Sequence, residues 1–258
     1  MNNITLIIPV HSLDNGLDGL LDKSVKSIDE SIVKPDRLII VYPKNQKIKK
    51  HLSSYTIEGV EVSLIENTGD SSFQSQLNLG VENVETEYFS YLAMDDEISK
   101  IWFKNVVEHI KYEPEVSCFL PILVETDIDN NFIGFSNEIA WATGFSDKQG
   151  YLDNNAVLSF FNISFDGMVI KKDVFNEIGG IKSNIKLTFI IEFFLRLTYN
   201  DYPVKVVPKL GYKHTNQRDG SLFVEYRKEL SEEESNFWLK AAKKEYFFVE
   251  DREINVVY

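Results

Sequence analysis

The stretch EYFSYLAMDDEISK, residues 87–100, decides the fold of this chain. Its first half is rich in aromatic and aliphatic residues, which predicts a buried strand over 87–93. Three acids, Asp95, Asp96 and Glu97, follow at the end of that strand. Neighbouring carboxylates repel one another and lose solvation where they approach the core. Three acids in this position therefore indicate a solvated turn, a metal site or an acid–base pair.

Short apolar runs alternate with helical patterns along the first hundred residues. Apolar side chains that recur every three or four positions predict a helix after each of the first three runs. This alternation is typical of βαβ units and predicts a largely parallel sheet. In open sheets of this kind, ligands bind beyond the carboxyl ends of the strands, where the three acids lie. The predicted strands before residue 87 are ITLII (4–8), RLIIVY (37–42) and VEVSLIEN (60–67), and the helices lie near 17–32, 45–54 and 73–81.

The second half of the chain has a less regular pattern. VSCFLPILVET (116–126) predicts a strand interrupted by Pro121. LTFIIEFFLRL (187–197) is apolar on nearly every helical face, which predicts a buried helix. VKVVPKLGYKH (204–214) returns to a strand pattern, and a capping box at 231–234 predicts a C-terminal helix.

The composition is that of a folded, acidic protein. At 258 residues the chain is long enough for one large domain or for two closely packed halves. Hydrophobic residues make up 43% of it and include 18 phenylalanines, which supplies a core and argues against global disorder. Lys and Arg number 27 against 40 Asp and Glu, giving a net charge of −13. Diffuse nucleic-acid binding relies on cationic surface, so this balance argues against it.

Cysteine content and hydropathy indicate where the protein works. Cys118 is the single cysteine, so the chain can form no intramolecular disulfide, which fits the reducing cytoplasm. No apolar run approaches the roughly 20 residues of a membrane span. The N-terminal sequence MNNITLIIPVHS lacks the basic segment of a signal peptide. We therefore expect a cytoplasmic protein without a transmembrane segment.

The position of the three acids favours one of their three interpretations. Acids in a loop are commonly just solvated. Hard cations such as Mg²⁺ and Mn²⁺, however, take oxygen ligands and often share them with a substrate diphosphate. Because an apolar strand leads into the acids at the ligand-binding edge of the sheet, we favour the metal site.

Several short motifs, taken in order, resemble those of family 2 glycosyltransferases with the GT-A fold. That family combines an apolar strand ending in I-P-x-Y-N, a strand ending in V-D-D, an N-x-G…N-x-G segment and L-D-x-D-D. The later DGMVIKKDVFNEIGGI is similar to its basic segment, short helix and G-G, and EFFLRLTYNDYPVKVVP to its acidic-x-x-x-R-L helix and strand. The resemblance covers roughly residues 4–215. The first four matching segments are LIIPVHS (6–12), KPDRLIIVY (34–42), ENTGDSSFQSQLNLGV (66–81) and EYFSYLAMDDEI (87–98).

The resemblance implies an α/β fold of GT-A type. Its central sheet would be mostly parallel and flanked by helices, with a small C-terminal helical extension. The chain would then divide into a nucleotide-sugar-binding half (1–98), an acceptor-binding half of the same domain (99–215) and a helical tail (216–258).

The implied activity is transfer of a hexosyl or pentosyl group from a nucleotide-diphospho-sugar to an acceptor hydroxyl. By analogy with the family, the donor is UDP-linked, the transfer inverts the anomeric centre, and Mn²⁺ or Mg²⁺ assists. The acceptor stays open among a glycan, a lipid-linked glycan, a protein and a modified nucleic-acid base. Carried over by motif, the donor-binding residues are Pro9, His11, Tyr42, Asn67, Gly69, Asn78, Met94 and Asp95, and the metal ligands are Asp95, Glu97 and His214.

The chain departs from the family pattern in two acidic motifs. Tyr42 and Pro43 stand where the family has the two acids of V-D-D. Tyr42 either stacks on the base in place of the missing acid or is an ordinary surface tyrosine. In L-D-x-D-D the first acid is replaced by Ala93, which leaves Asp95 and Asp96 as the aligned pair.

The catalytic base has two candidates. The family's E-D pair falls here on Phe189 and Ile190, which cannot accept a proton. Glu192 is the acid on the same helix, and burial among apolar residues would raise its pKa, as suits a base. An i,i+4 ion pair with Arg196 explains Glu192 equally well. Asp166, in a glycine-containing turn between apolar segments, is the competing candidate.

Other functional classes fit the sequence less well. A nucleotide-sugar pyrophosphorylase needs a basic, glycine-rich loop after its first strand, and PVHSLDNGLDG lacks the Arg or Lys. A dehydrogenase would show G-x-G-x-x-G there. The alternative that stays open is a degenerate GT-A domain that binds nucleotide or glycan without turnover.

Overall fold

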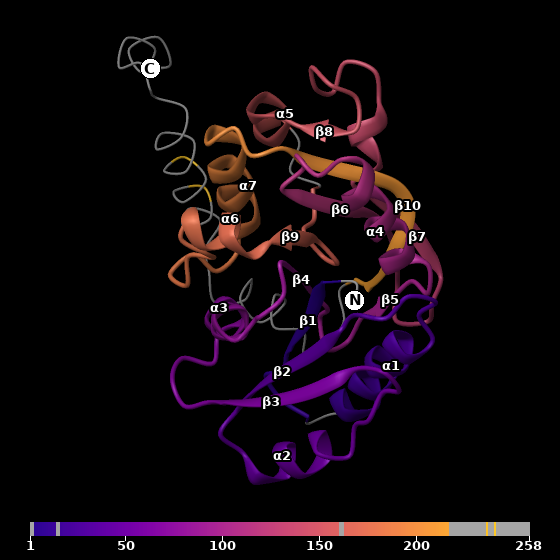
Figure 1. Ribbon diagram of the computed structural model, residues 1–258, viewed down its shortest axis with the longest axis vertical. Helices are drawn as coiled ribbons and strands as arrows, with labels where there is room; N and C mark the ends of the chain where they lie inside the picture. The colour runs from indigo at the N-terminus through magenta and orange to yellow at the C-terminus, as the bar shows by residue number, and fades with distance from the viewer. Residues whose placement is uncertain (1–2, 14–15, 160–162, 217–235, 237–239, 241–258) are drawn as a thin grey trace.

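The computed structural model describes residues 3–13, 16–159 and 163–216, with residues 236 and 240, and reveals a mixed α/β fold (Figure 1). One sheet runs through both halves of the described chain in the order β3-β2-β1-β4-β9-β6-β10-β5, with β7 on β6 and β8 on β10. The long central pairs are parallel, as predicted, and short antiparallel strands join the two halves.

The first half is built from parallel strands with helices between them, as the apolar pattern predicts. β2 alternates sides: Leu38 and Ile40 face the layer of α1 and α2, while Ile39 and Val41 face the layer of α3. Both faces are thus buried, which explains the continuous apolar runs. The elements are β1 (Ile4–Pro9), α1 (Leu17–Asp29), β2 (Arg37–Pro43), α2 (Gln46–Leu52), β3 (Glu61–Asn67), α3 (Phe73–Glu82), β4 (Tyr88–Tyr91) and β5 (Glu97–Ile98).

A glycine lets α3 approach the sheet closely. A Cβ on Gly80 would lie 2.6 Å from Cγ2 of Ile7 on β1. Such a distance is well inside van der Waals contact, so a larger residue would push the helix away from the sheet. The second glycine of the N-x-G…N-x-G segment therefore serves packing between helix and strand.

The second half is centred on the parallel pair β6 and β10. β6 continues through Pro121 instead of being interrupted there, because β10 bulges opposite it, between Val206 and Leu210. Proline has no N–H to donate, so a bulged partner accommodates it. The elements are α4 (Trp102–Tyr112), β6 (Cys118–Thr126), β7 (Phe132–Ser136), η1 (Glu138–Trp141), β8 (Tyr151–Leu152), α5 (Asn154–Ser159), β9 (Val169–Lys171), α6 (Lys172–Glu177), α7 (Phe189–Tyr199) and β10 (Val204–Thr215).

The remaining expectations concern the ends of elements and the tail. The first helix ends at Asp29, and Ile32, which was predicted to continue it, is 62% exposed. The predicted C-terminal helix lies outside the described residues, and the division into two functional halves stays a prediction. Within the described part of the chain, no helix has the length and apolar character needed to cross a membrane.

Gly211 on β10 provides a test of this packing. A Cβ there would lie 2.5 Å from the Trp102 ring and 2.6 Å from Pro121, both of which are rigid. We expect Gly211→Ala to lower the free energy of unfolding by about 1–3 kcal/mol, measured by urea denaturation. Gly134→Ala on β7, where nothing lies within 4 Å of the new Cβ, is the matched control and should have little effect. Equal effects of the two changes would contradict this packing.

Candidate active site

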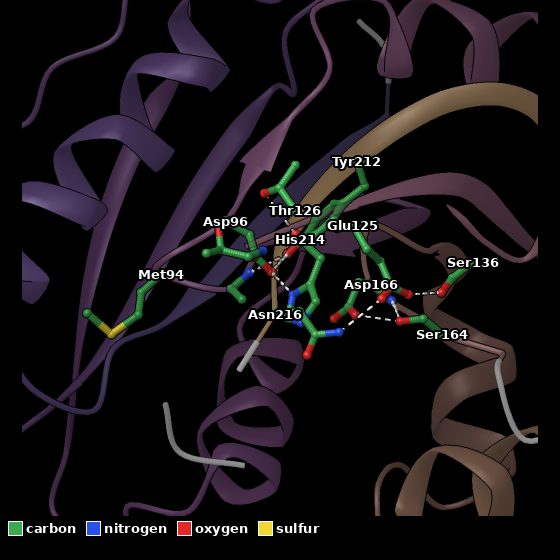
Figure 2. Close-up of polar contacts among 12 residues, drawn as sticks. Met94, Asp96, Glu125, Thr126, Ser136, Ser164, Asp166, Tyr212, His214 and Asn216 are labelled. Carbon is green, nitrogen blue, oxygen red and sulfur yellow. Dashed lines mark hydrogen bonds and ion pairs between the residues drawn. The ribbon is translucent and has the colours of Figure 1, made fainter. Parts of the chain in front are cut away.

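The acid turn between β4 and β5 is organised around one buried carboxylate. The side chain of Asp96 is 1% exposed and accepts three hydrogen bonds from β10 (Figure 2). The Tyr212 hydroxyl lies 3.0 Å from Oδ2, His214 Nδ1 2.9 Å from Oδ2, and the Thr215 backbone N–H donates to Oδ1 at 3.0 Å. Three donors satisfy this carboxylate, which explains how an acid is tolerated inside the fold.

Tyr212 connects the two ends of the acid turn. Its hydroxyl also accepts a hydrogen bond from the Ala93 N–H at 3.0 Å. Burial, followed by the charges of Asp96 and Asp166, raises the pKa of Tyr212 well above its usual value, so the hydroxyl keeps its proton and can donate it to Asp96. The Tyr212 hydroxyl thus contacts the backbone of Ala93, the residue that replaces the first acid of the family's L-D-x-D-D motif.

His214 lies within strand β10 rather than after it, and aspartates surround it. Burial lowers the pKa of His214, but the charge and hydrogen bond of Asp96, with the charges of Asp166 and Asp95, raise it to about 10. The ring therefore carries a proton at neutral pH. An imidazolium cannot ligate a metal, so this proton would have to leave before His214 could do so.

Asp166 is held in a tight turn on the other side of His214. Tyr91 Oη donates to one of its carboxylate oxygens. Ser164 Oγ donates to the other (Figure 2). Burial raises the pKa of Asp166, although the charge of His214 opposes the rise. A partly buried carboxylate with a raised pKa, fixed by neutral donors, is suited to accept a proton.

Glu97 points to the opposite face of the sheet from Asp96 and His214. Its carboxylate pairs with Lys213 Nζ at 2.7 Å, and neighbours along a strand face opposite ways. The structure therefore does not bring the predicted ligands Glu97 and His214 to one point. Among the described residues, no group of three or more His, Cys, Asp or Glu side chains could hold a metal ion.

The sequence as a whole matches the family model described as glycosyltransferase like family 2, over residues 5–247. The chain belongs to this family. No curated protein matches its sequence.

Solved structures with the same fold include several GT-A glycosyltransferases. S. aureus TarS 1-349 in complex with UDP-GlcNAc matches with a TM-score of 0.68 at 13% identity, over 97% of this chain and 68% of that one. Another structure of TarS 1-349 gives 0.58 at 13% identity, over 82% and 60%. A mannosyltransferase from Pyrobaculum calidifontis in complex with GDP-Man and Mn²⁺ gives 0.62 at 12% identity, over 84% and 58%. The chain thus spans between 58% and 68% of the length of these structures. At such identities the likeness establishes the fold.

Other residues aligned with the family's donor site lie at the carboxyl ends of the first strands. Pro9 ends β1, and His11 follows it, half-buried. Asn67 ends β3, where its Oδ1 accepts the Gly69 N–H at 2.9 Å and its Nδ2 donates to the Asp70 carbonyl at 2.7 Å. Asn67 therefore shapes this loop, and Gly69 is exposed on it. Their contact with a donor stays a prediction.

Three other residues predicted to bind the donor are buried or hydrogen-bonded within the fold, and their contact with a donor also stays a prediction. Tyr42 is 1% exposed because β2 turns it to the same face as Leu38 and Ile40, so it is not a surface tyrosine. Met94 is 2% exposed and points away from the polar cluster in Figure 2. Asn78 uses its amide to bond both the N–H and the carbonyl of Ile181, at 3.0 and 2.7 Å.

Glu192 lies in a buried ion cluster on α7. Its side chain is 2% exposed, 2.8 Å from Arg196 Nη2 and 2.9 Å from Lys182 Nζ. The i,i+4 ion pair that the sequence offered as the alternative is thus present. The two candidate bases differ in setting: cations neutralise Glu192, whereas Tyr91 and Ser164 hydroxyls bind Asp166.

Several residues of the site escaped the sequence motifs. Tyr212 could have been found, because it lies two positions from His214 on a strand and so shares its face. Glu125 on β6 accepts hydrogen bonds from Ser136 and Asn216 beside the same cluster (Figure 2). Nothing in the local sequence links Glu125 to the acid turn, since only strand pairing brings β6 beside β10.

The contrast between adjacent aspartates can be tested by stability. Asp96→Ala removes the acceptor of three donors, one of them the buried Tyr212 hydroxyl, and leaves the cation of His214 without its hydrogen-bonded partner. We expect the free energy of unfolding to fall by about 3–5 kcal/mol in urea denaturation. The matched control is Asp95→Ala, which should leave stability nearly unchanged or raise it by relieving repulsion between the acids. If Asp95→Ala were the more damaging change, the roles assigned to the two carboxylates would be reversed.

Proposed function

We propose that this chain transfers a sugar from a UDP-linked donor to an acceptor hydroxyl, with inversion and with the assistance of Mn²⁺ or Mg²⁺. The observation that carries the proposal is the gathering of the acid turn, His214 and Asp166 at one edge of the sheet. Family membership and the UDP-GlcNAc and GDP-Man complexes of proteins with the same fold support it. Cys118, the lone and buried cysteine, fits our expectation of cytoplasmic action.

The acid turn offers one carboxylate to a metal. Asp96 is buried against β10, where both of its oxygens accept hydrogen bonds. Asp95, beside it, is only half-buried, so its side chain is accessible to an ion from solvent. A single carboxylate fits Mg²⁺ or Mn²⁺, which commonly take their other ligands from water and substrate phosphates. Asp95 would therefore hold the ion together with the donor diphosphate. When bound, the metal would neutralise charge on the departing diphosphate as a Lewis acid.

The cation of His214 adds to that neutralisation. It lies among Asp95, Asp96 and Asp166, so a diphosphate that reaches Asp95 also comes near a positive charge. The hydrogen bond from Nδ1 to Asp96 fixes the ring plane, as outer partners commonly do for functional histidines.

Asp166 is the base that this arrangement favours. It would take the proton of the acceptor hydroxyl as that oxygen bonds to the anomeric carbon. The bond from that carbon to the diphosphate oxygen breaks on the opposite side, and its electron pair leaves with UDP. Tyr91 and Ser164 orient the Asp166 carboxylate through neutral donors, and burial raises its pKa although the charge of His214 opposes the rise.

Nucleotide binding tests the role of Asp95. We expect Asp95→Ala to abolish Mn²⁺-dependent UDP binding in isothermal titration calorimetry, because the diphosphate loses the ion that bridges it to the protein. Its melting temperature should match that of the wild type. Unchanged UDP affinity in the folded variant would show that these acids are structural.

A turnover assay distinguishes an active enzyme from a degenerate GT-A domain that only binds nucleotide or glycan. The degenerate domain gains support because Tyr42 and Ala93 replace acids of the family motifs and the E-D pair is missing. Wild-type protein is incubated with Mn²⁺ and a panel of UDP- and GDP-sugars, and nucleotide release is measured. Binding without release from any donor would favour the degenerate domain.

The two candidate bases give opposite patterns. Asp166→Asn keeps the shape of the side chain but removes its proton affinity, so turnover should fall by about a hundredfold to ten-thousandfold with donor affinity unchanged. Glu192→Gln should keep turnover but lower the free energy of unfolding by about 3–5 kcal/mol, since Arg196 and Lys182 lose their counter-charge. Arg196→Met in the Glu192→Gln background should recover much of that loss. A folded Glu192→Gln protein without transfer, beside an active Asp166→Asn, would reassign the base to Glu192.

A further inference from the structure

Asn137, just after β7, is a buried polar residue with an unusual backbone. It is 1% exposed, and its φ of 72° lies in the left-handed region that few residues other than glycine adopt. Asparagine tolerates this conformation better than most residues, but the backbone still costs free energy and persists only where its surroundings enforce it.

The amide of Asn137 is fully used by the segment that leads to Asp166. Its Oδ1 accepts the Ser164 N–H at 2.8 Å, and its Nδ2 donates to the carbonyls of Ser164 and Pro121, both at 2.9 Å. Asn137 occupies the N-cap position of η1, yet its side chain makes no capping bond there. The Asn137 side chain therefore bonds the Ser164 backbone and does not cap η1.

Ser164 passes this constraint directly to Asp166. Its hydroxyl donates to Asp166 Oδ2, and the Asp166 N–H returns a hydrogen bond to that hydroxyl at 3.1 Å. At the far end of the turn, Trp102 Nε1 donates to the Gly167 carbonyl at 2.9 Å. The turn is therefore anchored before and after Asp166 by side chains of distant segments.

We propose that Asn137 is a positioning residue for Asp166 in sugar transfer, an inference that rests on the proposed function. By bonding both backbone groups of Ser164 and the Pro121 carbonyl, Asn137 fixes the base-bearing turn against β6. Ser136, the residue before Asn137, donates a hydrogen bond to Glu125 on β6. The end of β7 therefore orders two carboxylates beside His214, those of Asp166 and Glu125. Displacing a catalytic group by about 1 Å can cost a hundredfold in rate, so such an anchor acts on turnover.

Turnover of Asn137→Gly tests this role, since glycine keeps the left-handed backbone and removes only the amide. With a donor from the panel that the wild type turns over, we expect kcat to fall by about tenfold to a hundredfold. The donor KM and Mn²⁺-dependent UDP affinity should stay as in the wild type, which also reports that the variant is folded. Asn130→Gly is the matched control: Asn130 has a φ of 62° on the same hairpin, and its side chain bonds only the exposed Lys213 amine among the contacts described. It should retain wild-type turnover.

A double-mutant cycle distinguishes positioning from general support of the fold. If Asn137 acts through Asp166, then Asn137→Gly should cause little further loss in the Asp166→Asn background. An equal fold-loss in both backgrounds would overturn the role, as would wild-type kcat in Asn137→Gly. If that variant does not fold, Asn137→Asp, which keeps the acceptor for the Ser164 N–H, replaces it, and wild-type kcat there would overturn the role too. A wild type that releases nucleotide from no donor would instead overturn the proposed function, and this role with it.

Discussion

The carboxylate of Asp96 is the constraint on which the functional edge of this fold depends. A buried charge must be matched by donors, and here all three come from one strand, β10. Tyr212 meets that need and also holds the start of the acid turn at Ala93. The orientation of the turn, the position of Asp95 and the plane of His214 are consequences of satisfying this single group.

Adjacent residues in this region have different roles because strands alternate. Asp96 and His214 face one side of the sheet, while Glu97 and Lys213 form their own ion pair on the other. A run of three acids thus gives one buried structural carboxylate, one in an ion pair with Lys213 and one, Asp95, that is half-buried in the turn after β4. The three charges that are adjacent in the sequence therefore lie in three different environments in the fold.

Much of the fold could be predicted from local patterns, and the site only in part. Periodicity identified the strands of the first half because each is buried on both faces, and the carboxyl-end rule located the acid turn. Tyr42 is buried because strand alternation turns it to the same face as Leu38 and Ile40, which alignment with the family motif does not reveal. Asn78 aligned with a donor-binding position yet anchors the loop at Ile181, a contact 103 residues away that no local pattern shows. Glu125 and Asn137 were missed for the same reason: their partners are neighbours only after the strands have paired.

Hydrogen bonds of the acid turn join residues 116 to 119 positions apart in the chain. During synthesis the acid turn leaves the ribosome long before β10 exists, so Asp96 must remain solvated until that strand arrives. Contacts of such separation raise the entropic cost of folding and slow it. The same arrangement makes the cluster a late product of folding, since a chain that ends before β10 lacks all three of the donors to Asp96 described above. In this fold, the cluster around His214 can therefore assemble only once β10 has been synthesised.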